Sequence, residues 1–342
     1  MKTKGQHHIP RFLLNGFASR QSGKEHYTWV FRAGCAPVES NTRDVAKQKF
    51  FHGDPAASPL ESTVAEKETS FASLLQRVRT GGIGAADVPS VCELVVHLAV
   101  RTKNLRDGFA QLGRDFLAVA EEKLTAPDKK ERRRMRQGLA KAFREELQKP
   151  ELKYLLSRLP SWQRKAFLGK ARAQIAKLNV PLEISSFFEL FRGELAGKMG
   201  ESARNAHLRV LNQDMAPAKR VADITRLCWT VATPKGGRLV LGDVAVISRI
   251  QGADGFAHLM TAEEDRPATT IILPITPDSA ITGSISPLQE IPADEVNRAS
   301  VELTRDFFVA SQLTDTEREL ATRIGTRSLL FTQDDFRQIL QS

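Results

Sequence analysis

The sequence predicts an α+β fold that is mostly helical, with a β-hairpin near the N-terminus and a small mixed or antiparallel sheet near the C-terminus, packed on helices. Three observations carry this prediction. Aromatic residues alternate over residues 26–32, apolar residues recur every three or four positions over residues 59–78, and β-branched runs separated by Gly and Pro occupy residues 225–290. With 342 residues, 41% of them hydrophobic, the chain is long enough for one large domain or two lobes.

The N-terminal third begins with the hairpin and continues into two helices. Residues 26–32 suit a strand, and Ala33-Gly34 turns the chain into a second short strand near Pro37–Glu39. One helix is predicted over Pro59–Val78 and ends at Gly81-Gly82. The next helix starts at Asp87-Val88-Pro89, and its apolar stripe extends to Leu105.

The rest of the chain changes from helix to strand and back. The pattern stays helical from Asp107 to Asp214, with prolines dividing it into helices of ordinary length. Strands are predicted over residues 226–232, 238–241, 244–247 and 269–273. A helix over Ala293–Gln312 is predicted to use Phe307 and Phe308 on its core face, with further helix over Thr314–Arg323. We therefore expect a single domain over residues 1–342, a helical lobe inserted at 108–214 and a small sheet region at 225–290.

Composition and missing motifs exclude several classes of protein. No stretch of about 18 apolar residues occurs and the start is not that of a secretory signal, so we expect a cytoplasmic protein with no membrane partner. The three cysteines are far apart, which argues against a zinc ribbon or a disulfide framework, and each is expected to be a small buried hydrophobe. The phosphate-binding, nucleophile-elbow and dinucleotide-binding glycine motifs do not occur.

Positive charge is concentrated in the predicted lobe. Residues 121–177 hold seventeen Lys or Arg against seven Asp or Glu, which accounts for the whole net charge of +10. Such a segment favours an anionic partner, a nucleic acid or another polyanion. A solvated helical face is the alternative interpretation, and helix-spaced ion pairs near Glu145 and Glu146 are consistent with it. The candidate nucleic-acid contacts are Lys129, Lys130, Arg132, Arg133, Arg134, Arg136, Lys141 and Arg144.

The first seventeen residues carry the most specific motif. Residues 6–18 read Gln-His-His-Ile-Pro-Arg-Phe-Leu-Leu-Asn-Gly-Phe-Ala. They resemble the opening of a mainly bacterial domain of unknown function whose members begin with a Gln-His-x-Ile/Val-Pro-x-Phe-x-Leu-x-x-Phe-Ala pattern. The apolar residues Ile9, Phe12, Leu13 and Phe17 are expected to be buried, beside histidines and an arginine that stay polar.

Shorter similarities to that family occur along most of the chain outside roughly 110–200. Residues 97–102 lie where family members carry a helix that ends in Arg-Thr, and residues 239–246 lie where members carry a strand and then Ser-Asp-x-Pro-Val. Asp243 is kept in this second motif, but Gly242 replaces the serine and Ala245 the proline. A role that needs a hydroxyl beside the aspartate is therefore not expected here.

Polar residues next to apolar runs form a candidate catalytic constellation. A metal-dependent phosphodiesterase needs carboxylates for Mg²⁺ or Mn²⁺, a base that activates water and a cation that stabilises phosphorane charge. The candidate catalytic residues are His7, His8, Arg101 and Asp243, and the candidate metal ligands are Glu61, Glu68 and Asp243.

A structural interpretation of the same residues stands beside the catalytic one. Arg101 and Glu68 could form a buried, hydrogen-bonded ion pair that fixes the path of the N-terminal segment, and Asp243 could shape a turn after a strand. Two functional hypotheses follow. The first is a nucleic-acid-associated binding protein, in bacterial defence or regulation, whose basic lobe contacts phosphates; the second is a metal-dependent nuclease.

Overall fold

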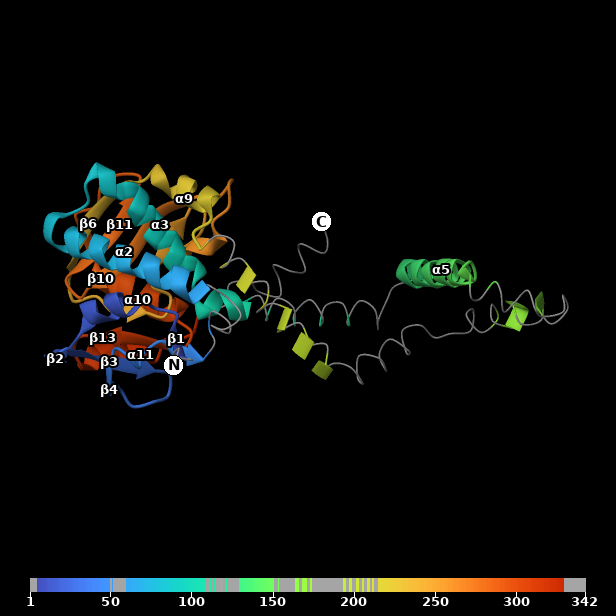
Figure 1. Ribbon diagram of the computed structural model, residues 1–342, viewed down its shortest axis with the longest axis horizontal. Coiled ribbons are helices and arrows are strands. Elements are labelled where there is room, and N and C mark those ends of the chain that lie inside the picture. Colours follow the sequence, from blue (N-terminus) through green and yellow to red (C-terminus); the bar gives the residue numbers. More distant parts are fainter. Residues whose placement is uncertain are drawn as a thin grey trace. The chain divides into compact units, whose positions relative to one another are not determined.

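The computed structural model describes residues 5–49, 51, 60–108, 129–150 and 215–328, with single residues and short pieces between 111 and 121 and between 153 and 211 (Figure 1). Contacts divide the chain into two compact units. The first comprises Met1–Phe109 with Ser202–Thr332, and the second comprises Ala110–Glu201 with Gln333–Ser342. The described residues combine helices with three sheets, which confirms the α+β class.

A six-stranded mixed sheet forms the larger part of the first unit. Its strands are β6 (Cys228–Lys235), β8 (Ile247–Ile250), β9 (Phe256–His258), β10 (Ala268–Thr276), β11 (Ser279–Ser284) and β12 (Glu290–Pro292). They lie in the order β12-β6-β11-β10-β8-β9, and only the β12–β6 pair is parallel. Ile271, Ile272 and Leu273 of β10 are all buried, so this strand is covered on both faces, as its continuous apolar run predicts.

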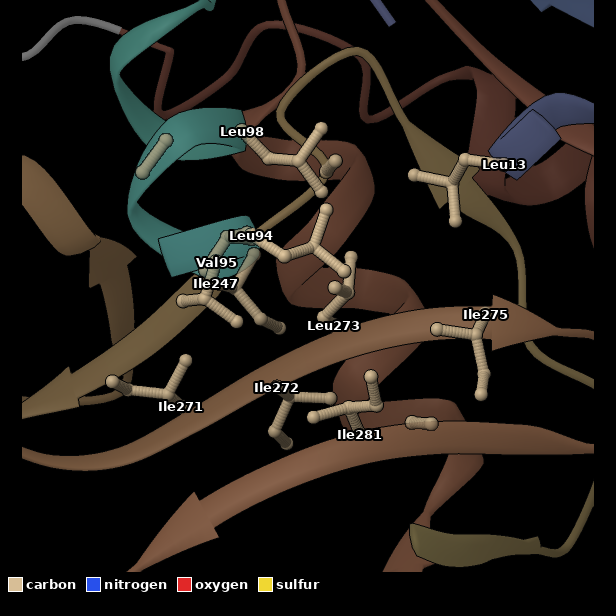
Figure 2. Close-up of a cluster of buried hydrophobic side chains, with 14 of the residues drawn as sticks. Leu13, Leu94, Val95, Leu98, Ile247, Ile271, Ile272, Leu273, Ile275 and Ile281 are labelled. Atoms are coloured by element: carbon tan, nitrogen blue, oxygen red, sulfur yellow. The ribbon is translucent and has the colours of Figure 1, made fainter. Parts of the chain in front are cut away.

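Two long helices cover one face of this sheet. They are α2 (Leu60–Gly81) and α3 (Val88–Val100), joined through the short 3₁₀ helix η2 (Ala85–Asp87). Both confirm helices predicted from periodicity, although α3 ends five residues before Leu105. Figure 2 shows Leu94 and Leu98 of α3 pointing toward the strand that carries Leu273.

A second sheet joins the two ends of the first unit. It contains β2 (Arg20–Ser22), β3 (Glu25–Arg32), β4 (Val38–Asn41), β7 (Leu241–Gly242) and β13 (Phe307–Ala310). The β3–β4 pair is the predicted hairpin, with Thr28 opposite Ser40. On its other side β3 pairs with β13, and the rings of Phe31 and Phe308 stack at 4.6 Å. The hairpin is therefore part of a larger sheet, because a strand about 280 residues further along the chain pairs with it.

The N-terminal motif forms one short strand and two short helices. It forms β1 (Gly5–His7), α1 (Arg11–Leu14) and the 3₁₀ helix η1 (Asn15–Phe17), and β1 pairs antiparallel with β5 (Lys47–Lys49). Ile9, Leu13 and Phe17 are fully buried, as predicted, whereas Phe12 is only half-buried.

Further described helices are α9 (Ala218–Thr225), α10 (Ala293–Leu303), α11 (Asp315–Ala321), the 3₁₀ helix η3 (Leu259–Thr261) and, in the second unit, α5 (Lys129–Glu146). Among the helices that the structure describes, none is long and apolar enough to cross a membrane.

The predicted helix over Ala293–Gln312 is wrong in its second half. Helix α10 ends at Leu303, and Phe307 and Phe308 lie in strand β13. Thr304 is extended, and the carboxylate of Asp243 accepts the backbone N–H groups that follow it. The apolar spacing of four continues from Leu303 to Phe307, so periodicity alone could not place this boundary.

Two predicted strands are also displaced. Only Leu241 of residues 238–241 lies in a strand, and only Ile247 of residues 244–247 does. The side-chain amide of Asn297 takes the place of a neighbouring strand: its Oδ1 accepts from Val240 N at 2.9 Å and its Nδ2 donates to Arg238 O at 2.7 Å. The prediction for the cysteines holds for Cys92, whereas Cys35 and Cys228 are exposed.

Gly242 lies where β7 contacts the end of α10. A Cβ at this position would lie 2.2 Å from Thr304 Oγ1 and 2.9 Å from the carbonyl oxygen of Ser300. Both distances are shorter than real Cβ contacts, and the Thr304 hydroxyl is held by its hydrogen bond to Ser300 O at 2.8 Å. The chain therefore needs glycine here for a close approach of backbone to helix.

We expect Gly242→Ala to lower the free energy of unfolding by about 1–3 kcal/mol, because the buried contact has no room for a methyl group. Urea unfolding measures this change. The control is Gly237→Ala, whose added Cβ meets Ala293 Cβ at an ordinary 3.7 Å. Equal stability of the two variants would contradict the steric account of Gly242.

Candidate functional site

The side chain of Arg101 joins three elements in the first unit. It follows the last residue of α3 and is only 2% exposed. One terminal nitrogen donates to the carboxylate of Glu68 on α2, and the other donates to the backbone carbonyl of His7 in β1. The ion pair that the sequence suggested between Arg101 and Glu68 is therefore present, and His7 adjoins it through its backbone.

The two histidines of the N-terminal motif have different surroundings. His7 Nε2 lies 2.9 Å from the carbonyl oxygen of Arg43, so this nitrogen carries the proton and donates it. Burial lowers the pKa of His7, although the hydrogen bond to Arg43 opposes that change. His7 is thus a neutral, hydrogen-bonded group beside the Arg101–Glu68 pair.

His8 is more deeply buried and lies among aromatic rings. Its ring centroid is 5.5 Å from that of Phe51 and 5.9 Å from that of Phe307. Neither ring nitrogen has a hydrogen-bond partner among the described residues. Burial, together with the nearby positive charge of Arg101, lowers the pKa of His8 to about 3. His8 therefore stays neutral at physiological pH.

Asp243 binds backbone and has no partner among the other candidate side chains. Its Oδ1 accepts from Arg305 N at 2.9 Å, and its Oδ2 accepts from Asp306 N at 2.6 Å and from Phe307 N at 3.3 Å. Burial raises the pKa of Asp243 to about 6, against the lowering effect of these three donors. Both oxygens hold the turn between α10 and β13, and the ring of Phe307, whose backbone N–H donates to Asp243, lies beside His8.

Paired charges lie around His8. Lys103 contacts Asp306, Arg305 Nε lies 3.5 Å from an Asp107 oxygen, and Arg106 Nη2 donates to Gln48 Oε1 at 2.9 Å. Asp306 and Asp107 are thus each paired with a cation. Such a cluster can position backbone and exclude water, and it presents no described carboxylate free of a partner.

The described part of the chain shows no preformed metal centre. It contains no group of three His, Cys, Asp or Glu side chains placed to hold an ion. Glu68 is paired with Arg101, and the carboxylate of Asp243 is occupied by backbone. Glu61 lies in α2, but its side chain is outside the described residues. The hypothesis of Mg²⁺ or Mn²⁺ ligation by these three residues therefore stays a prediction.

The candidate nucleic-acid contacts lie on or beside α5 of the second unit. Lys130, Arg132, Arg133, Arg134, Lys141 and Arg144 are exposed, whereas the side chains of Lys129 and Arg136 are outside the described residues. At about 100° per residue, five of the exposed cations fall within an arc of roughly 100° around the helix. We call these five the α5 basic face, and they are Lys130, Arg133, Arg134, Lys141 and Arg144.

The structure also contains a pocket that the sequence did not predict. A pocket of about 190 Å³ is lined by residues of α3, α9, η3 and the start of β10. Its charged residues include Arg220 and Asp223 on α9, a helix that was not predicted. The sequence does show an arginine and an aspartate three residues apart in a short amphipathic segment, and this spacing could have indicated that both lie on one side of a helix.

These features define an α+β protein with a buried, arginine-centred polar cluster and a separate basic helix. A family model described as "Protein of unknown function (DUF4238)" matches residues 5–315, and the chain belongs to this family. Comparison with curated proteins finds no match. Comparison with solved structures also finds none.

We expect Arg101→Met to lower the free energy of unfolding by about 2–4 kcal/mol, because Glu68 and the His7 carbonyl lose a buried charged donor. Urea unfolding provides the measurement. Arg318→Met is the matched control, since the Arg318–Asp315 pair is exposed and should contribute less than about 0.5 kcal/mol. A loss no larger than that of the control would show that the Arg101 pair does not hold the fold.

Stability should rise with pH between about 4 and 6.5. Burial lowers the pKa of His8 and His97 to about 3 and that of His258 to about 4, from the ordinary histidine value of 6.5. The unfolded chain therefore binds more protons in this window, and each histidine contributes stability that is complete above pH 6.5 and lost as pH falls. Asp243 acts in the opposite direction between pH 3.8 and about 6, one group against three.

Replacement of one histidine tests this account. We expect His8→Phe to reduce the slope of unfolding free energy against pH by about 1.3 kcal/mol per pH unit near pH 5. Urea unfolding at half-unit intervals from pH 4.5 to 7 gives the slope for both proteins. An unchanged slope would mean that His8 is protonated to the same extent in the folded and unfolded states.

Proposed function

We propose that this protein binds nucleic acid through the α5 basic face. The observation that carries the proposal is the gathering of five exposed cations on one side of an 18-residue helix. Fourteen residues separate Lys130 from Arg144, so the face extends over about 21 Å along the helix axis. A phosphate backbone offers charges at intervals that such a row of side chains can follow.

The charges on this face have few acidic partners. Among the residues that the structure describes, only Lys141 has a carboxylate within 4 Å, that of Glu145 at 3.8 Å. Both side chains of that pair are mostly exposed, so the pair adds little stability and leaves the lysine available. The excess of ten positive charges in residues 121–177 favours the same interpretation, because solubility needs less.

The opposite side of α5 supports a defined orientation for the basic face. Met135, Leu139 and Phe143 recur every four residues and are each half-buried. An amphipathic helix packs its apolar side and leaves its charged side in water. We further propose that residues 108–214 form a lobe inserted into the family domain that presents this face, and the division of the chain near 110 and 201 supports that proposal.

Neutralising the basic face should weaken binding and its dependence on salt. The variant carries Gln at all five positions of the α5 basic face. We expect the full chain to bind a 20-base-pair DNA duplex or a single-stranded RNA at 50 mM salt, and the variant to bind at least about 100-fold more weakly. If all five cations contact phosphate in duplex DNA, the slope of log affinity against log salt should become smaller by about 4.5.

A matched control removes the same number of exposed cations elsewhere. Its five Gln substitutions are at Lys24, Lys219, Lys235, Arg266 and Arg318. The control should keep most of the affinity if the α5 basic face is the contact. Equal losses in both variants would mean that net charge alone attracts the nucleic acid, and the absence of binding by the unmodified chain would contradict the proposal.

The same protein and nucleic acids can test whether the chain cleaves nucleic acid as well as binding it. Incubation of the chain with DNA or RNA and Mg²⁺ or Mn²⁺ tests for cleavage. Cleavage that is lost in His8→Ala or Asp243→Asn, with binding retained, would favour a metal-dependent nuclease. The described residues supply no observation that favours cleavage over binding, and binding is therefore the function we propose.

A further inference from the structure

The pocket beside α9 combines an apolar lining with charged groups. Val96 of α3, Ile224 of α9 and Leu259 of η3 contribute apolar side chains, and all three are buried. A volume of about 190 Å³ exceeds the roughly 150 Å³ of an apolar cavity that admits benzene. The pocket therefore has room for a branched or aromatic side chain of a small molecule.

The charged lining is balanced between the two signs. It contains Lys219, Arg220 and Arg226 together with Asp223, Glu263 and Glu264. Lys219 Nζ is paired with Glu264 at 3.0 Å, and both side chains are exposed. The pocket as a whole is thus electrically neutral, which does not suit a multiply charged anion such as a nucleotide.

Among the described residues, no oppositely charged side chain pairs with Arg220 or with Asp223. Arg220 is half-buried, and one terminal nitrogen donates to the carbonyl oxygen of Ala262. No carboxylate of the described chain lies within 4 Å of this guanidinium, and no described cation lies within 4 Å of Asp223. The two residues are three apart on α9, so they lie on the same side of the helix without pairing with each other.

We propose that this pocket binds a free α-amino acid with an apolar side chain. Its carboxylate would accept hydrogen bonds from the Arg220 guanidinium, its ammonium group would donate to Asp223, and its side chain would enter the apolar lining. An arginine binds a carboxylate through two parallel donors, and it needs no metal or cofactor to do so. Arg220 and Asp223 lie one helical turn apart on α9, and their opposite charges match the carboxylate and the ammonium group that an α-amino acid carries on one carbon atom.

The balance of charge in the pocket should favour an amino acid over ligands that carry only one of its two charges. A ligand with only a carboxylate would leave Asp223 near an added negative charge, and a ligand with only an ammonium group would leave Arg220 near an added positive one. Either ligand leaves a polar group of the pocket without a partner, which costs more than a missing apolar contact. Binding should therefore require both charges together with the apolar side chain.

Calorimetric titration of the full chain at pH 7.5 tests the proposal. The probes are L-leucine, 4-methylpentanoate, which lacks the ammonium group, 3-methylbutylamine, which lacks the carboxylate, and glycine, which lacks the side chain. We expect L-leucine or L-phenylalanine to bind, and the three lesser probes to bind at least about tenfold more weakly than L-leucine. No binding of either amino acid at about 10 mM would overturn the proposal, as would equal binding of L-leucine and 4-methylpentanoate.

Two substitutions test which residue binds the ligand's carboxylate and which binds its ammonium group. Arg220→Gln should weaken L-leucine binding at least about tenfold and remove the preference over 3-methylbutylamine, whereas Asp223→Asn should remove the preference over 4-methylpentanoate. Arg266→Gln is the control, because this exposed arginine is next to Pro267 of the lining and is not itself in the lining. Thermal unfolding verifies that each variant is folded. Unchanged preferences in both variants, or an equal loss in the control, would overturn the assignment.

Discussion

Arg101 directly follows α3 and its guanidinium is buried. An arginine cannot lose its charge inside a protein, so the neighbouring elements must supply its partners. Glu68 of α2 supplies the opposite charge and His7 of β1 supplies a carbonyl oxygen. The N-terminal motif is thereby fixed against two helices that cover the larger sheet. His8 follows this fixed segment directly, and its ring lies beside Phe307 of β13.

Asp243 imposes a similar constraint near the other end of the first unit. Its carboxylate holds three successive backbone N–H groups, so α10 stops and the chain extends into β13. The strand then pairs with β3 and joins the two ends of the unit in one sheet. The contacts of Arg101 and Asp243 thus give a structural reason for polar residues beside apolar runs in the motifs that resemble the family's pattern.

The sequence predicted what local spacing determines and missed what distant residues determine. Helices α2 and α3 and the β3–β4 hairpin follow from apolar periodicity and turn residues, and the family match confirms the resemblance at the level of a domain of unknown function. The change from α10 to β13 depends on Asp243, some 60 residues away, and the absence of a strand before Leu241 depends on Asn297. Neither side chain has a local signal. The Arg101–Glu68 pair could be proposed only because both residues lie in predicted helices, whereas the pocket beside α9 needed four elements placed together.

The two proposed sites would recognise their ligands by opposite uses of charge. On the α5 basic face the cations add, because they have one sign and few partners, and attraction to a polyanion needs no exact geometry. Salt should weaken that attraction strongly, since released counterions drive it. In the pocket beside α9 the charges cancel in sum, so a distant ion feels little net field and recognition must come from hydrogen bonds at contact distance. Affinity there should be nearly independent of salt, because a zwitterion bound to a neutral pocket releases few counterions. Salt dependence is consequently the property that distinguishes binding at one site from binding at the other in the same chain.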